Sequence, residues 1–228
     1  MAKYNYSQFI TKISEIVRDD AEKLSLFEKE NYLQEAVKIY SRHRPRKVIE
    51  DITGDGNYDY SISQNLSEWI DGFSIIEAIE YPADSRTPNI LTEEDYIVYE
   101  KEDGKYLRFL NYTPSSDEKI RVTYTTLHQV TVSSNTIPEV DQDALCNLAA
   151  SLCSGALASI YASTSDPTIG ADAVNYRSKS QEYQARAEKQ KENYLNHLGM
   201  KDQEIPPSSV IGGTSYISIR RRGLTHSY

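Results

Sequence analysis

The second half of the sequence contains two long stretches with apolar residues at helical spacing. Residues 139–163 predict a helix with one stripe facing a core, formed by Leu145, Leu148, Leu152, Ala156, Leu157 and Ile160. Residues 169–198 predict a second helix, with a stripe formed by Ala173, Tyr176, Ser180, Tyr183, Ala187 and Tyr194. Gly199 is expected to end it, because glycine readily takes the left-handed conformation of a C-cap. We expect the two helices to pack antiparallel as a hairpin at the centre of the fold.

Most other positions of the first helix carry small side chains, which allow another backbone to come close. They are Ala149, Ala150, Ser151, Cys153, Ser154, Gly155, Ala158 and Ser159. Two interpretations fit this pattern: tight packing within the chain, or a subunit contact repeated around a ring.

Two amphipathic helices are predicted at the start of the chain, over residues 4–18 and 25–43. The basic run 42–47 closes the second helix, where positive charge suits the helix C-terminus and Pro45 prevents continuation. The run fits a solvated cap, or a contact with nucleic acid or an acidic partner.

Residues 47–132 instead show alternating apolar and polar positions with many β-branched and aromatic residues. This pattern predicts antiparallel strands in a peripheral module. Residues 53–57 and 102–105 are expected to be hairpin turns because they contain glycine, and residues 81–90 are expected to form a loop.

The predicted fold class is therefore α+β. An α-helical core, made from helices at 4–44 and 139–198, contains the long hairpin and an inserted antiparallel β module at 47–132. Together they form a body over residues 1–204. Residues 205–228 predict an extended C-terminal arm, because this segment is rich in Pro, Gly and Ser and has no core of its own.

Charge is distributed unevenly along the chain. The net charge is −9, and removing the three arginines of the arm, which has no acidic residue, leaves −12 for residues 1–204. A body this acidic argues against broad DNA contacts, which need cations to neutralise phosphates. DNA is expected to be a passenger rather than a ligand.

The two cysteines and the apolar runs point to a protein that stays where it is made. Cys146 and Cys153 lie seven residues apart on one predicted helix, about 10 Å along its axis, too far for a disulfide. They are expected to be reduced core thiols. Neither a run of about 20 apolar residues nor a signal peptide is evident, so we expect synthesis in a host cytoplasm and no membrane partner.

Sequence motifs for catalysis, cofactors and metals do not occur. The chain has no Walker loop, nucleophile elbow, zinc helix or paired Cys-x-x-Cys, so we expect no enzyme activity and no cofactor. His43, His128, His197 and His226 lack ligand spacing and are expected to be surface or capping residues. The run from Asp55 to Asp59 resembles a calcium loop, but Tyr60 and Leu66 replace its essential Gly and Glu.

Several phrases together resemble the head-tail connector, or neck adaptor, proteins of tailed bacteriophages. They are residues 40–46, 71–74, 79–83 and 122–125 and the helical stretch from Asp141 through 173–179. The resemblance covers most of residues 25–200, and the long β region departs from the family pattern.

The resemblance implies a virion structural protein at the head-tail junction. It implies a ring, commonly of about twelve copies, beneath the portal protein, contacts with downstream neck or tail proteins, and a central DNA channel. The alternative is a virion-assembly chaperone or another non-catalytic binding module.

The arm carries the expected partner-binding residues: Tyr216, Ile217, Ile219, Arg220, Arg221 and Arg222. Alternation over residues 216–219 suits addition to a sheet edge, and the arginines suit an acidic surface. We expect the portal to supply both; the alternative is a tail without a partner.

Overall fold

The computed structural model describes residues 3–163 and 172–200, with side chains from residue 179 onward in the second range. The helices are α1 (Tyr6–Val17), α2 (Leu26–His43), α3 (Ile62–Asn65), α4 (Gln142–Ser163) and α5 (Asp172–Leu198), with a 3₁₀ turn η1 (Glu139–Asp141) before α4. The strands are β1 (Arg46–Thr53), β2 (Asp59–Ser61), β3 (Ile76–Glu80), β4 (Tyr96–Lys101), β5 (Gly104–Phe109) and β6 (Lys119–Thr126). The fold is α+β, as predicted.

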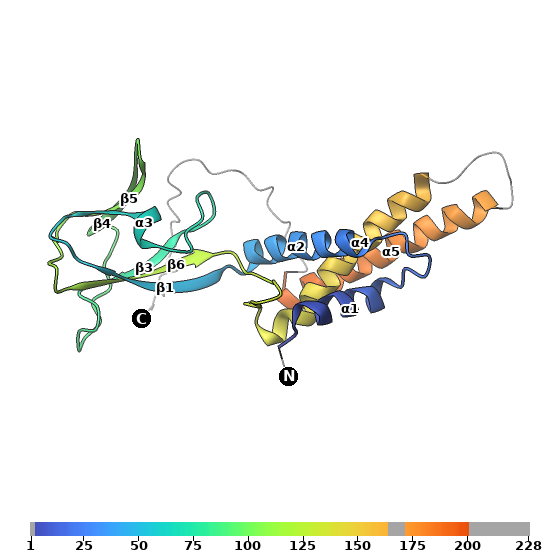
Figure 1. The fold of residues 1–228 in the computed structure, drawn as a ribbon, viewed down its shortest axis with the longest axis horizontal. Coiled ribbons are helices and arrows are strands. Elements are labelled where there is room, and N and C mark those ends of the chain that lie inside the picture. Colours follow the sequence, from blue (N-terminus) through green and yellow to red (C-terminus); the bar gives the residue numbers. More distant parts are fainter. Residues whose placement is uncertain (1–2, 164–171, 201–228) are drawn as a thin grey trace, which may run out of the picture.

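The molecule is elongated, with the long helices at one end and the strands at the other (Figure 1). Each end has its own hydrophobic core. We call the first end the helical body (α1, α2, α4, α5 and η1) and the second the β module (residues 46–126). The β module is thus peripheral to the helices, as the sequence predicted.

Helix α4 lies at the centre of the helical body and packs against α1, α2 and α5. The predicted hairpin is confirmed, since α4 and α5 lie side by side and antiparallel (Figure 1). Ser154 donates to Gln190 across this contact, and the rings of Tyr161 and Tyr183 stack with centroids 5.5 Å apart. The expected start of the second helix at residue 169 falls outside the described residues.

The prediction of a single leucine stripe on α4 is wrong. Ala149, Ala150, Cys153 and Ser154 are fully buried, whereas Leu152 is only partly buried. The reason is that helices enclose α4 on several sides, so its small positions face neighbours as well. Packing within the chain therefore occupies these four positions, whereas Gly155 is partly buried with open space beside it and Ser159 is exposed.

Helices α1 and α2 confirm the predicted N-terminal pair. Asn5 and Ser25 each close a capping box with a residue three positions later, which fixes where the two helices begin. Gly199, at φ +73°, ends α5 as expected.

The β module consists of two three-stranded antiparallel sheets, with strand orders β1-β6-β3 and β2-β5-β4. The hairpin predicted at residues 102–105 joins β4 to β5, and Gly104 takes the positive φ of +130° that the turn requires. The hairpin predicted at 53–57 is wrong, because β1 pairs with β6 and β2 pairs with β5. This turn passes from one sheet to the other. A side chain at Gly54 would collide with the carbonyl oxygen of Ser115.

The predicted end of the β module at residue 132 is also wrong. The last strand stops at Thr126, and the chain then returns to the helices. Val130 and Ile137 are almost fully buried in the core of the helical body. An apolar pattern alone does not tell which of two cores a residue joins.

The segment Glu139–Ser163 is long and apolar enough, by length and composition, to cross a membrane, with a mean hydropathy of 1.4. Small and polar residues interrupt the apolar run, so the segment does not stand out as a continuous apolar stretch in the sequence. In the fold, 67% of the apolar window is buried, as befits a core helix.

Candidate functional site

The arm residues expected to bind a partner, 216–222, lie outside the described residues. The described chain leads towards the arm through Gly199 and Met200, which follow the last turn of α5. A polar cluster fixes the last turn of α5, at the place where the helical body meets the β module. We call this region the joint: residues 40–47, 67–68, 126–141 and 194–198.

A buried carboxylate stands at the centre of the joint. Asp141, with a side chain only 2% exposed, accepts hydrogen bonds from Tyr40 Oη at 2.6 Å and from Arg44 at 3.0 Å. His197 Nε2 lies 2.7 Å from its Oδ1. The carboxylate therefore ties together the end of α2, the start of α4 and the last turn of α5.

This environment favours the charged carboxylate. Burial acts to raise the pKa of Asp141, but the hydrogen bonds from Tyr40, His197 and Arg44 outweigh it, and the pKa is lowered overall. The same contact raises the pKa of Tyr40, for which burial is the larger cause.

The basic run 42–47 is largely paired within the chain, so it is more than a solvated cap. Besides Arg44 with Asp141, the guanidinium of Arg46 forms two hydrogen bonds with the carboxylate of Glu68, and Lys47 pairs with Glu77 at 2.7 Å. The Arg46 and Lys47 pairs join β1 to the turn before β3 and to β3 itself, whereas the Arg44 pair ties the end of α2 to Asp141. The interpretation that the whole run binds nucleic acid is not supported, because three of its cations already have acidic partners.

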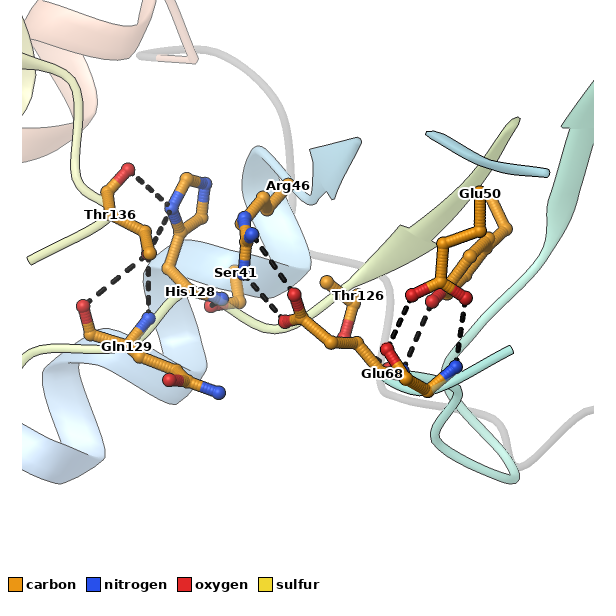
Figure 2. Close-up of polar contacts among 10 residues, drawn as sticks. Ser41, Arg46, Glu50, Glu68, Thr126, His128, Gln129 and Thr136 are labelled. Carbon is orange, nitrogen blue, oxygen red and sulfur yellow. Dashed lines mark hydrogen bonds and ion pairs between the residues drawn. The ribbon is translucent and has the colours of Figure 1, made fainter. Parts of the chain in front are cut away.

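Figure 2 shows how this polar network continues across the joint. Ser41 on α2 accepts a hydrogen bond from the backbone N–H of His128, whose ring contacts Thr136. Thr126, at the end of β6, donates to the backbone oxygen of Glu68 at 2.7 Å. The Ser41–His128 bond ties the end of α2 to the chain that returns from β6, whereas the Thr126–Glu68 bond lies within the β module. Two chain segments therefore link the ends of the molecule, one from α2 to β1 and one from β6 to η1, and the Ser41–His128 bond holds them together.

His197 agrees with the expectation of surface or capping positions, since it is exposed in the last turn of α5, but two other histidines do not. His128 is buried at 8% exposure and His43 is half-buried with Nδ1 2.6 Å from Tyr194 Oη, whereas His226 lies outside the described residues. Burial lowers the pKa of both His43 and His128. The sequence signal that was overlooked is that His43 lies one turn after Tyr40, close to the buried face of α2.

Neither metal nor thiol chemistry is apparent in the described part of the chain. No group of three or more His, Cys, Asp or Glu residues there is placed to hold a metal ion. Cys146 and Cys153 are free and buried, and burial raises the pKa of each thiol to about 12. Both cysteines are therefore unreactive core residues, as predicted.

A second cluster, not anticipated from the sequence, lies on the exposed face of the sheet β2-β5-β4. Asp59 accepts from Arg108 at 2.6 and 2.7 Å, from Lys101 at 2.9 Å and from Tyr99 at 2.8 Å. The hydrogen bonds from Arg108 are the largest cause of the lowered pKa of Asp59. Arg108 also lies over the ring of Tyr58, which is 53% exposed. Exposed tyrosine and arginine are typical of protein-binding surfaces.

Comparison with protein-family models gives no match, and comparison with curated proteins gives none either. Among solved structures, the chain is similar to one described as "Neck of empty GTA particle computed with C6 symmetry". The sequence identity is 11% and the TM-score is 0.28, over 76% of this chain and 87% of that chain. A TM-score of this size does not establish a common fold.

Proposed function

We propose that this protein is a virion structural protein of a tailed bacteriophage: a neck adaptor. In this role a ring of copies lies beneath the portal, lines the DNA channel and joins the capsid to the tail. The sequence phrases at 40–46, 71–74, 79–83 and 122–125 support the assignment through their resemblance to that family.

The structural observation that carries the proposal is the end-to-end arrangement of two cores with a fixed joint. A connector must hold two partners at a constant separation, so it needs two distinct surfaces on one rigid subunit. The Asp141 cluster fixes the helical side of the joint, the Arg46–Glu68 pair fixes the side of the β module, and the Ser41–His128 bond links α2 to the chain that returns from β6. The helical body is suited to one contact and the exposed tyrosine–arginine face of the β module to another.

The charge of the body is compatible with a channel for DNA. Residues 1–204 carry −12, and three of the cations in the basic run 42–47 are paired with acidic residues. A body with this net negative charge repels phosphates on balance, so DNA is expected to pass without being held.

The test is to isolate particles and measure whether the protein is present, and in what ratio to the portal. A neck adaptor is expected at about one copy per portal subunit and at the neck in cryo-electron micrographs. An assembly chaperone would be required for particle formation yet absent from purified particles, and that result would overturn the proposal.

A further inference from the structure

Strand β4 has one edge that no strand of the described chain covers. It stands last in the order β2-β5-β4, with β5 on its other side. The N–H of Leu110 donates to the carbonyl oxygen of Asp95, and hydrogen-bonded residues alternate along an antiparallel pair. Tyr96, Val98 and Glu100 therefore direct their backbone N–H and C=O groups to the open edge. Such an edge is a template for an added strand.

The middle of this edge is apolar. Ile97 and Val98 are 41% and 43% exposed, between Tyr96 and Tyr99. Proteins that must avoid strand addition place charges or proline at such positions. On β4 the charged side chains, Glu100 and Lys101, lie only at the end of the strand next to the hairpin, and the middle of the edge is apolar. Strand β4 lies at the end of the molecule away from the helices (Figure 1).

The approach to β4 is strongly acidic. Glu93, Glu94 and Asp95 come directly before the strand, and Glu93 and Glu94 are exposed. Within the described residues, neither glutamate forms an ion pair. A strand whose apolar part is followed by cations would match this edge.

The sequence of the arm has this pattern, an apolar alternation at 216–219 followed by three arginines, and we propose that the β4 edge receives residues 216–222 from the arm of a neighbouring copy. The added strand runs antiparallel to β4. This proposal rests on the ring of the proposed function, and it replaces the portal, expected from the sequence alone, as the acceptor of the arm.

One register satisfies both the apolar and the charged positions. It places Tyr216, Ile217, Ser218 and Ile219 opposite Tyr99, Val98, Ile97 and Tyr96. Arg220, Arg221 and Arg222 then come next to the turn Thr92–Asp95 at the start of β4, which carries Glu93, Glu94 and Asp95. Residues directly opposite each other share a face of the sheet. The two isoleucines then extend the apolar face of Val98 and Tyr96, while the three arginines face the acidic turn before β4.

The length of chain before the strand permits this exchange. Residues 201–215, which follow the end of the described chain at the joint, span up to about 50 Å when extended. Every copy carries both a donor strand and an acceptor edge, so the contact is head-to-tail. Contacts of this type close into rings when the rotation between copies allows it.

The test uses two variants of the full chain, Ile97→Cys and Ser218→Cys. These positions are opposite in the proposed register, at a pair that is not hydrogen-bonded, where the Cα atoms come close enough for a disulfide. The native Cys146 and Cys153 are buried and do not compete. Because each copy has only one added cysteine, oxidation of the mixture reports contacts between copies.

The expected result is a disulfide-linked heterodimer on a non-reducing gel. The control pairs Ser218→Cys with Ile49→Cys on β1, which is 62% exposed in the other sheet, and should give at least tenfold less product. Replacing all three arginines by glutamate should lower the yield several-fold in low salt. An equal yield of the disulfide between positions 49 and 218 would overturn the proposal. A further variant carries Cys at both 97 and 218, and a disulfide that forms only within this single chain, never between copies, would overturn it too.

Particle analysis of the same variants separates this inference from the proposed function. If the protein joins the neck without forming the disulfide between positions 97 and 218, the strand exchange is refuted and the adaptor assignment stands. If the protein forms this disulfide in solution but is absent from particles, the adaptor assignment is refuted and the strand exchange is supported.

Discussion

The hydroxyl of Tyr40 donates a 2.6 Å hydrogen bond to Oδ2 of Asp141, which lies 101 residues further along the chain. Arg44 and His197 contact the same carboxylate, so three helices converge on one buried charge. The contact with His197 also fixes the point from which the chain leaves towards the arm. Stability of the helical body and the position of the arm are thus coupled through Asp141.

Asp141→Asn is expected to lower the free energy of unfolding by about 2–4 kcal/mol. The substitution keeps the shape but removes the charge that Arg44 and Tyr40 contact, and bonds to charged groups contribute more than neutral ones. Tyr40→Phe, which removes a single donor, should cost about 1–2 kcal/mol. Urea unfolding measures both. The control is Arg42→Ala, which changes an exposed residue on α2, the helix of Tyr40. If Asp141→Asn lowers the free energy of unfolding no more than Arg42→Ala does, the carboxylate does not hold the joint together.

Leu157→Ala is expected to cost about 2–5 kcal/mol, because Leu157 is fully buried and the substitution leaves a cavity. Leu152→Ala, on the same helix but only partly buried, should cost clearly less. The pair tests whether α4 faces its neighbours as described. Equal losses measured by urea unfolding would mean that the phase of α4 is wrong.

The helices were predictable because each carries its own local signals. Ser25 begins α2 and Gly199 ends α5 through interactions within a few residues, and spacing at three and four positions marks the buried faces. The strand pairing was less accessible. The turn after Thr53 contains the residues of a hairpin, yet β1 pairs with β6, some 70 residues away at Asp51 and Arg121.

The joint could not be found from spacing, because its partners are brought together only by the packing of α2, α4 and α5. In the sequence, Asp141 is indistinguishable from other acidic residues near the start of a helix, and His197 from other polar residues near the end of one. Only the fold shows that one buried carboxylate serves Tyr40, Arg44 and His197. Similarly, the alternation of β4 predicted a strand but not that one of its edges is open.

Stability should fall as the pH drops below about 6.5, the ordinary pKa of histidine. Burial lowers the pKa of His43 and His128 in the folded state, with Arg42 and Arg46 as further contributors, while Asp141 acts in the opposite direction on His128. The neutral rings therefore stabilise the fold fully above pH 6.5, and this contribution is lost as the pH falls towards the folded pKa values.

The measurement is the urea midpoint between about pH 7.5 and pH 5.5. His43→Gln and His128→Gln should each flatten its pH dependence. A midpoint that rises on acidification over this range, or a slope unchanged in the double variant, would contradict the assignment of neutral buried rings.

Deleting residues 205–228 should leave the melting temperature of the body unchanged and abolish incorporation into particles. Both cores are built from residues of the described helices, strands and loops, and we expect them to fold without the arm. Under the proposed strand exchange, the deletion removes the donor strand and leaves every β4 edge empty, so rings should fail to form at salt concentrations where the full chain assembles.

Replacing Arg220, Arg221 and Arg222 by alanine should give a partial defect that grows with salt, since the remaining main-chain bonds persist while charge pairs are screened. Calorimetry, light scattering and particle analysis together decide the outcome. A deleted chain that assembles and joins the neck at full occupancy would refute the arm as a tether, and one that no longer folds would place the segment in the core.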